Sequence, residues 1–198
     1  RVKNNLQIIS SILGLQSQRV ADAEARDLFR ECQGRVRAMA LVHDNLYETR
    51  NFAVVDVPEL LRSLSSNVLR LFGADSRRIK LDLSVEPVVL EVEKAIPCAL
   101  ITSELLTNAL KHAFPDERAG RIELALRQVR DTDVSLSVAD DGVGIPAGVD
   151  PSASDSLGLD IVRTLTRQLR GELSVSRDGG TKVTITFPRV ERIEQSAG

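Results

Sequence analysis

Four polar residues fall at helical spacing in the segment ITSELLTNALKHAF, namely Glu104, Asn108, Lys111 and His112. Steps of four and then three or four residues place side chains on one face of an α-helix. The amide oxygen of Asn108 is a hard ligand that suits Mg²⁺, which proteins usually hold through few side chains together with phosphates. Lys111 and His112, one turn further on, are candidate contacts for those phosphates. The same spacing also fits an ordinary amphipathic helix with a solvated polar face.

A second candidate is the stretch DDGVGIP, which begins at Asp140 and follows the strand-like pattern VSLSVA. A carboxylate at the end of a strand can read the edge of a nucleotide base, and Gly142 and Gly144 would let the backbone approach such a ligand. Asp and Gly are also common turn residues, so the stretch alone favours a turn.

Two glycine-containing stretches complete the set. In SLGLDIV, Gly158 and Leu159 lie where a loop becomes a helix, and the free N–H groups of a helix N-terminus bind phosphate. In GGTKVTI, Gly180 and Thr181 lie between two strand patterns. A glycine near a helix start and a hairpin turn are the plainer explanations of these two stretches.

Residues 1–50 are predicted to form two helices, with Asp22 at the start of the second. Apolar residues recur at steps of three and four on both helices, as in coiled coils. Helices with such wide apolar faces should pair with another copy or with the rest of the chain. The apolar stripes are Val2, Leu6, Ile9, Leu13 and Val20; Ile8, Ile12 and Leu15; and Phe29, Cys32, Val36, Met39, His43 and Leu46.

The rest of the chain alternates helix and strand signals, so the predicted class is α+β. Asp56 and Glu59 form a capping box before a helix through Leu71 that Gly73 ends. The other predicted helices are 93–113, with Pro97 in its first turn, and 157–169, ended by Gly171. The predicted strands are 79–85, 122–126, 134–138, 173–176 and 183–187. We therefore divide the chain into a helical hairpin at 1–50, a mixed sandwich at 51–190 and a frayed tail at 191–198.

Composition excludes several classes of function. The 198 residues carry a formal net charge of −2, which gives no reason to expect a nucleic acid or an anionic membrane as partner. There is no Trp and there are only five Phe, so base-stacking surfaces are not expected. The two cysteines, Cys32 and Cys98, suit a reducing compartment, and we expect a cytoplasmic location and no membrane segment.

The four stretches together resemble the Bergerat ATP-binding fold of histidine kinases, gyrase, MutL and the ninety-kilodalton heat-shock chaperones. The resemblance covers residues 56–188 and implies ATP and Mg²⁺ as ligands. It implies that Asp140 accepts the adenine amino group, with Asp141 a solvated neighbour. It further assigns Gly142 and Gly144 to the base and the hinge of an ATP lid, Asn108 to the metal, Gly158 and Leu159 to phosphate, and Gly180 and Thr181 to the adenine end.

The N-terminal stretch RVKNNLQIISSILGLQ is similar to the dimerisation and phosphotransfer region of HWE-like histidine kinases. In that family the phosphoacceptor box reads His-Arg-x-Lys-Asn-x-Leu-Gln, so we expect the acceptor histidine immediately before Arg1. His43 is not expected to replace it. Asn4 is a candidate for orienting a water during dephosphorylation of a regulator, although a solvated asparagine is the simpler interpretation. The expected partners are a second copy, through residues 1–50, and the receiver domain of a response regulator.

The predicted activity is therefore transfer of a phosphoryl group from ATP to a protein histidine and then to a regulator aspartate. Glu104 is expected to act as a base toward the histidine, because a carboxylate near the phosphates can take its proton. Two alternatives remain open. One is an ATPase of the gyrase and MutL type, in which Glu104 activates water, and the other is a non-enzymatic scaffold that docks a regulator. Residues 144–158 are predicted to form a mobile lid.

Overall fold

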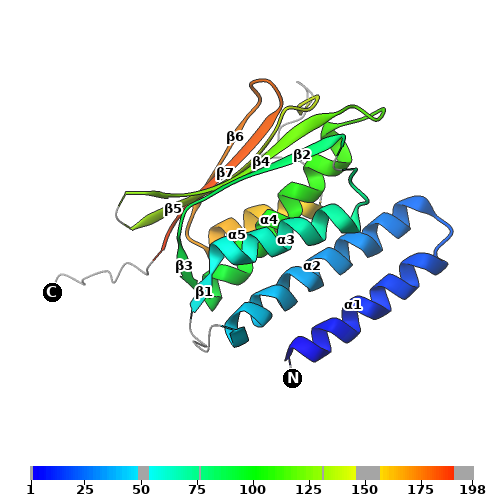
Figure 1. Cartoon of the computed structure of the whole chain (residues 1–198), viewed down its shortest axis with the longest axis horizontal. Helices are drawn as coiled ribbons and strands as arrows, with labels where there is room; N and C mark the ends of the chain where they lie inside the picture. Colours follow the sequence, from blue (N-terminus) through cyan, green and yellow to red (C-terminus); the bar gives the residue numbers. More distant parts are fainter. Residues whose placement is uncertain (1, 49–53, 76, 131, 146–156, 190–198) are drawn as a thin grey trace.

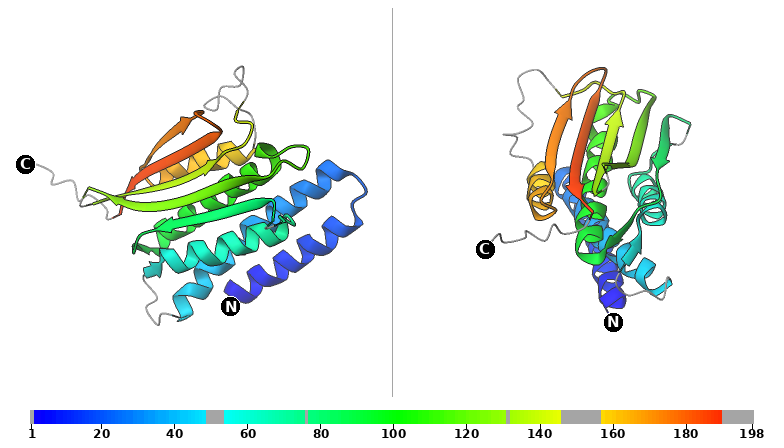
Figure 2. Two further views of the ribbon diagram at one scale, coloured as in Figure 1. Left: turned by 45° about the horizontal axis from the view of Figure 1, so that its top comes forward. Right: turned by 90° about the vertical axis from the view of Figure 1, so that its left-hand side faces the viewer.

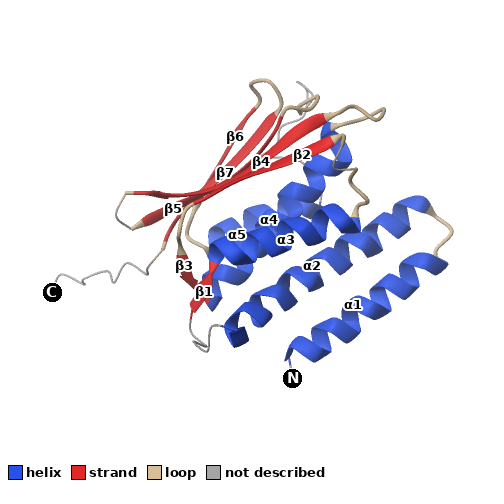
Figure 3. Cartoon of the chain, viewed as in Figure 1, coloured by secondary structure: helices blue, strands red, loops and turns tan. Residues whose placement is uncertain are grey.

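The computed structural model describes residues 2–48, 54–75, 77–130, 132–145 and 157–189. In chain order the elements are α1 (Val2–Arg19), α2 (Ala23–Glu48), β1 (Val54–Asp56), α3 (Val57–Leu71), β2 (Ile79–Val85), β3 (Val89–Glu91), α4 (Val92–Asn108), the π-helix η1 (Ala109–Ala113), β4 (Gly120–Val129), β5 (Asp133–Asp140), α5 (Leu157–Gln168), β6 (Glu172–Ser176) and β7 (Thr181–Pro188). Helices α3, α4 and α5 cover one face of the sheet, and the hairpin of α1 and α2 packs beneath them with α1 outermost (Figures 1 and 3).

The helical hairpin forms as the sequence predicts. Asp22 begins α2, and its Oδ1 accepts a hydrogen bond from the backbone amide of Ala25 at 2.7 Å. Such a cap satisfies one of the N–H groups that a helix start leaves without a partner. An ion pair of 2.8 Å between Lys3 Nζ and Asp44 Oδ1 fixes the first turn of α1 beside the later part of α2.

The contact between α1 and α2 differs from the predicted apolar stripe, because small and polar residues make much of it. Ser10 and Ser17 are the buried residues of α1. The carbonyl of Ser10 accepts a hydrogen bond from Gln33 Nε2 at 2.9 Å. A side chain at Gly14 would meet the same Gln33 nitrogen at 2.7 Å, so glycine permits the close approach there. The apolar residues of α1 that this arrangement leaves exposed are Val2, Ile8, Ile9, Ile12 and Leu15.

Five strands form the main sheet in the order β2-β4-β5-β7-β6. The pair β2 and β4 is parallel, and the other three pairs are antiparallel. Antiparallel strands can join through a short hairpin, whereas parallel strands need a crossover. Here α4 lies in the crossover between β2 and β4. All five strands of this sheet were predicted from the sequence. Figure 2 shows them side by side in one twisted sheet, with the helices on one of its faces.

The core lies between the sheet and the helices. Asp56 caps α3 by accepting a hydrogen bond from the Glu59 amide at 3.1 Å, as the capping box predicts. Gly73 follows the helix with φ of +63°, a conformation that glycine adopts without strain. Fully buried side chains from both layers meet in this core, including Leu60, Leu64, Ile101, Leu106, Ile122, Leu124, Leu136 and Phe187.

Several local predictions need correction. Pro97 lies inside α4, which begins at Val92, and therefore not in the first turn as predicted. The helix predicted for 93–113 changes to a π-helix after Asn108. At the end of α5 the residue with positive φ is Arg170, at 53°, and not Gly171. The two-stranded ribbon of β1 and β3 was not predicted, because three-residue strands are too short to show alternation.

Other predictions fall on residues that the structure does not describe. They are the mobile lid, of which 146–156 lie outside the described residues, and the frayed tail at 191–198. Among the described helices, none has the length and apolar character needed to cross a membrane.

Candidate functional site

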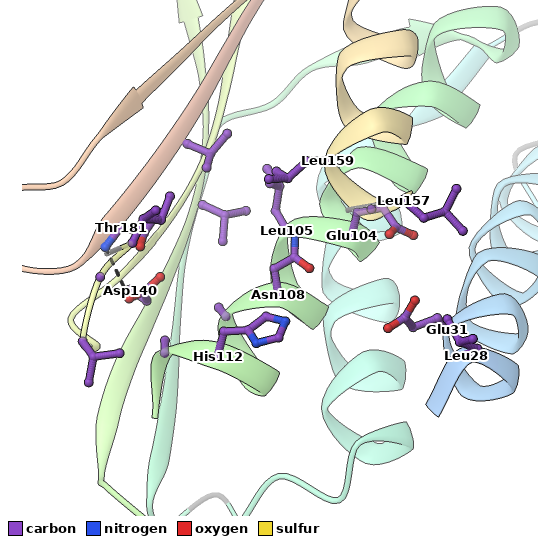
Figure 4. Close-up of a pocket in the computed structure, with 18 of the residues that line it drawn as sticks. Leu28, Glu31, Glu104, Leu105, Asn108, His112, Asp140, Leu157, Leu159 and Thr181 are labelled. Carbon is purple, nitrogen blue, oxygen red and sulfur yellow. Dashed lines mark hydrogen bonds between the residues drawn. The ribbon is translucent and has the colours of Figure 1, made fainter. Parts of the chain in front are cut away.

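A cavity of about 750 Å³ lies between the sheet and the helices, and Figure 4 shows how its side chains are arranged. Strands β5 and β7 form one wall, α4 and η1 form the floor, and α5 and α2 close the remaining sides. Its lining residues are Glu24, Leu28, Glu31, Glu104, Leu105, Asn108, Ala109, His112, Ala113, Val138, Asp140, Val143, Gly144, Ile145, Leu157, Gly158, Leu159, Thr181 and Val183.

Asp140 is the last residue of β5 and lies at the sheet end of the cavity. Its Oδ1 accepts hydrogen bonds from the backbone amides of Gly142 at 2.9 Å and Thr181 at 3.3 Å. Within the described residues, Oδ2 accepts no hydrogen bond. Burial raises the pKa of Asp140, and the two backbone hydrogen bonds oppose that rise. The carboxylate is therefore fixed through one oxygen while the other is available to a ligand.

The glycines around Asp140 have different roles. Gly144, with φ of +72°, lines the cavity. Gly142 and Gly180 do not line it, and both permit close packing of the backbone. A Cβ on Gly142 would lie 2.3 Å from the carbonyl oxygen of Ala113, and one on Gly180 would lie 1.9 Å from that of Asp140. These two glycines therefore support the position of Asp140 from outside the cavity.

Of the four polar residues on the predicted helix, three line the cavity: Glu104, Asn108 and His112. Lys111 is not among the lining residues, and its Nζ forms an ion pair with Glu31 Oε1 at 2.6 Å. The spacing argument assumed 3.6 residues per turn. It fails for Lys111, because η1 has the i→i+5 pattern of a π-helix, whereas His112 still faces the cavity.

Glu104 is buried and paired with a residue that the sequence analysis did not single out. Arg35 of α2 donates from Nε to Glu104 Oε1 at 2.7 Å and from Nη2 to Oε2 at 2.9 Å. The side chain of Glu104 is 5% exposed and that of Arg35 is 14% exposed. The hydrogen bonds to Glu104 raise the pKa of Arg35 against the opposing effect of burial. A two-pronged contact of this kind fixes the orientation of the carboxylate.

The first turn of α5 faces Glu104 and Asn108. A Cβ built on Gly158 would lie 3.0 Å from Glu104 Oε2 and 3.6 Å from Asn108 Oδ1. Leu159 follows in the same turn and also lines the cavity. The end of the cavity opposite Asp140 therefore combines two side-chain oxygens with the N-terminus of a 12-residue helix.

His112 lies in the cavity as a neutral ring at pH 7. Burial lowers its pKa, the positive charge of Lys111 lowers it further, and Glu31 opposes both effects. A neutral imidazole can take up a proton when a negatively charged ligand arrives.

Two residues considered in the sequence analysis lie away from the cavity. Asn4 is exposed on α1, and His43 is partly buried on α2 without lining the cavity. In contrast, Glu24, Leu28 and Glu31 line the cavity from α2 and were not predicted to do so. Nothing in their spacing distinguishes them from other residues of an amphipathic helix, because their position depends on how the hairpin packs.

Two family models match consecutive parts of the chain. Residues 1–72 match the model described as histidine kinase, and residues 93–191 match the model described as histidine kinase-, DNA gyrase B-, and HSP90-like ATPase. The second match covers the sheet from β4 onward, α4 and α5, and therefore every element that carries the cavity apart from α2.

Named relatives agree with these matches. The chain is 37% identical over 192 residues to the sensor histidine kinase PdtaS of Mycobacterium tuberculosis, which covers 95% of this chain and 38% of that protein. It is 33% identical over 197 residues to the blue-light-activated histidine kinase 2 of Erythrobacter litoralis, covering 95% of this chain and 55% of that protein. The chain thus spans well under two thirds of either relative.

The solved histidine kinase domain of the Erythrobacter litoralis EL346 blue-light-activated kinase has a similar structure. The TM-score is 0.73, the sequence identity is 28%, and the match covers 94% of each chain. The chain therefore belongs to the histidine kinase-, DNA gyrase B- and HSP90-like ATPase family, as a histidine kinase core of the HWE type.

Proposed function

We propose that this core binds ATP with Mg²⁺ in the cavity and transfers the γ-phosphoryl group to a histidine, from which it passes to an aspartate of a response regulator. One arrangement carries the proposal. A single cavity joins the available oxygen of Asp140 at one end to Asn108, Glu104 and the start of α5 at the other. The first end suits a base and the second suits phosphates.

The adenine end has both a polar and an apolar component. Asp140 Oδ2 would accept a hydrogen bond from the exocyclic amino group of adenine. Val138 and Val183 from the sheet, Leu105 from α4 and Ala109 from η1 would provide apolar surface on either side of the base. Planar ligands bury well in such apolar slots when a few polar groups fix their orientation.

The phosphate end fits a magnesium ion in its donor chemistry. The Oδ1 of Asn108 and the Oε2 of Glu104 are oxygen donors that lie near the same point at Gly158. When bound, Mg²⁺ would neutralise the negative charge of the phosphates. Asn108 would hold the metal, the first turn of α5 at Gly158 and Leu159 would face the phosphates, and His112 would contact them. No cluster of three or more His, Cys, Asp or Glu side chains suited to a metal occurs among the described residues.

The reaction itself requires an imidazole nucleophile. From the resemblance of the first residues to the family's phosphoacceptor box, we expect this imidazole immediately before Arg1. A ring nitrogen would attack the γ-phosphorus while the bond to the bridging oxygen of ADP breaks. Glu104 would accept the proton released by the ring, provided that its carboxylate is freed from Arg35. Proton acceptors of this kind typically contribute about 10²–10⁴-fold to a rate.

The same proposal includes the partners and the organisation of the chain. The exposed apolar residues of α1 would pack against a second copy, so that two hairpins form a four-helix bundle. Residues 1–50 would be the dimerisation and phosphotransfer unit, 51–190 the catalytic domain and 191–198 a tail. Exposed Asn4 is retained as a candidate for dephosphorylation of the regulator. We place the core in the cytoplasm, where ATP and response regulators meet.

The test is to compare this chain with a chain extended by a histidine immediately before Arg1 and a few preceding helical residues. Labelled ATP should give acid-labile labelling of the extended chain only, and a His→Gln change at the added position should abolish it. Labelling of the unextended chain at His43 would overturn the assignment of the acceptor.

The position of Glu104 in the cavity favours one alternative function, an ATPase in which this carboxylate activates water. In that case the extended chain would release free phosphate at a rate that depends on Glu104 and would stay unlabelled. The absence of any binding of Mg²⁺-ATP to either chain would reject both enzymatic functions.

A further inference from the structure

Four charged side chains link the helical hairpin to the phosphate end of the cavity, and we call them the interdomain ion-pair network: Glu31, Arg35, Glu104 and Lys111. Two contacts cross from α2 to the catalytic layer. They are Arg35 to Glu104, at 2.7 and 2.9 Å, and Lys111 to Glu31, at 2.6 Å.

A third contact closes the network on α2, where Arg35 Nη2 lies 3.5 Å from Glu31 Oε2. Positive and negative side chains alternate along the network, so its formal charge is zero. The two crossing pairs are largely shielded from water, with side-chain exposures between 5% and 25%. Partly buried pairs are screened by salt much less than pairs on the open surface.

The network ties up two side chains that the proposed reaction needs unpaired, Glu104 and Lys111. Glu104 would have to release Arg35 before it could accept a proton. Lys111 is a cation one turn beyond Asn108, and its charge is neutralised by Glu31. Glu31 itself lines the same cavity as Asn108, and Figure 4 shows its carboxylate directed toward the space between α2 and Glu104.

The arrangement also separates the cavity from the start of α1. The Lys3–Asp44 pair places that start near Asp44, 13 residues along α2 from Glu31. At 1.5 Å per helical residue, the two positions are about 20 Å apart. A phosphoryl group in the cavity cannot reach a side chain before Arg1 on the same hairpin while α2 stays docked in this position.

We propose that the interdomain ion-pair network is an autoinhibitory contact that Mg²⁺-ATP opens by exchanging charges. The phosphates compete with Glu31 for Lys111, and the metal at Asn108 competes with Arg35 for Glu104. Nucleotide binding and docking of the hairpin therefore oppose each other. When the nucleotide replaces the ion pairs between α2 and the catalytic layer, α2 becomes free to move. The inference rests on the proposed function, because it needs ATP in this cavity.

The first experiment measures affinity by calorimetry with the non-hydrolysable analogue Mg²⁺-AMP-PNP and with adenosine. Glu31→Gln should bind the analogue about fivefold tighter, the scale of one ion pair that no longer has to be broken. Its affinity for adenosine should stay unchanged, because adenosine has no phosphate to compete with Glu31. Asp27→Asn is the matched control. It removes the same charge from α2, where Asp27 pairs with Arg30 on the surface at 3.2 Å, and should leave both affinities unchanged.

A double-mutant cycle separates competition for Lys111 from simple repulsion between Glu31 and phosphate. In a Lys111→Gln background, Glu31→Gln should no longer raise the affinity. A gain that persists there, or an equal gain in Asp27→Asn, would overturn the proposal.

The second experiment measures the docking directly. Spin labels at the exposed positions Gln16 on α1 and Asp178 between β6 and β7, with Cys32→Ser, report the distance from hairpin to sheet. Mg²⁺-AMP-PNP should shift the distance distribution to longer or broader values, and Glu31→Gln should do so partly without nucleotide. If the analogue binds but the distribution is unchanged, the autoinhibitory contact is rejected while the proposed function stands. If Mg²⁺-AMP-PNP binds neither the wild-type chain nor Glu31→Gln, the proposed function fails.

Discussion

Asp140 and Thr181 are direct partners on the neighbouring strands β5 and β7, and the backbone amide of Thr181 donates to Asp140 Oδ1 at 3.3 Å. The register of two strands thus orients the carboxylate, and the Gly142 amide adds a second hydrogen bond at 2.9 Å. The side chain needs no partner from the helical layer to hold its position.

Asp140→Asn should weaken ATP binding roughly 10- to 150-fold, the equivalent of about 1.5–3 kcal/mol for a hydrogen bond to a charged acceptor. The fold should be retained. Because burial raises the pKa of Asp140, the native state holds its proton more tightly than the unfolded chain does, and the ionised group reduces stability as pH rises through the native pKa. At pH 7 the variant should therefore melt at the same temperature as the wild type or higher.

The matched control is Asp141→Asn. In the wild type, the Asp141 carboxylate accepts a hydrogen bond from the Arg121 amide at 2.7 Å, and Asp141 does not line the cavity. Calorimetric titration should show that this variant binds ATP with the affinity of the wild type. An unchanged affinity in Asp140→Asn would show that Asp140 does not read the base.

Asn108→Ala should reduce the affinity for Mg²⁺-ATP by at least about tenfold and leave the affinity for adenosine unchanged. Loss of a group that supports a metal typically lowers metal affinity about 10–100-fold. Adenosine lacks the phosphates with which the metal interacts. Asn67→Ala on α3, away from this cavity, makes the same helical substitution and should alter neither affinity. Equal losses for both ligands would show that Asn108 has a structural role.

Binding of ATP should take up protons at His112. Its pKa is lowered by burial and by Lys111, so the ring is neutral at pH 7 before the phosphates arrive and their charge favours protonation. Affinity should therefore rise as pH falls through neutrality toward the pKa of the unliganded ring, which lies below the ordinary histidine value of about 6.5. Calorimetry in buffers of different ionisation enthalpy measures the uptake directly.

His112→Gln should abolish this proton uptake, and His43→Gln on α2 should not. A buffer-independent binding enthalpy in the wild type would mean that phosphate does not approach His112.

Gly158→Ala should reduce nucleotide affinity, whereas Gly180→Ala should reduce the stability of the fold. At Gly158, a methyl group would crowd Glu104 Oε2 at 3.0 Å in a helix that tolerates alanine, so nucleotide affinity should fall while the melting temperature is kept. At Gly180, φ is +140° and a methyl group would lie 1.9 Å from the Asp140 carbonyl oxygen, so the fold itself should be destabilised. Thermal melts and titrations of both variants check the contrast. A fall in melting temperature for Gly158→Ala would contradict it.

The sequence alone predicted the five strands of the main sheet, the hairpin and the cavity segments other than α2, because alternation, capping residues and glycine positions are local signals. It placed Asp140, Asn108, Glu104 and Gly158 in one site by resemblance to a family, and the structure brings these residues together around one cavity.

It could not predict what depends on packing between distant segments. The pairing of Arg35 with Glu104 joins residues 69 positions apart and leaves no pattern in either helix. The π-helix at Ala109–Ala113 turned Lys111 away from the lining, and no residue in that stretch indicates a change of helical pitch. The exposed apolar face of α1 was predicted as apolar, but its exposure follows from the small residues that pack against α2.

Because β2 and β4 pair in parallel, the proposed nucleotide site would be complete only in a fully assembled domain. Because the helix with Glu104 and Asn108 is the crossover between these two strands, its position over the sheet is fixed only once both strands have paired. A partly folded chain with β5, β6 and β7 already joined would present Asp140 and Thr181 without the opposite wall. ATP should therefore select the completely folded molecule, and raise its apparent stability as ligand concentration increases.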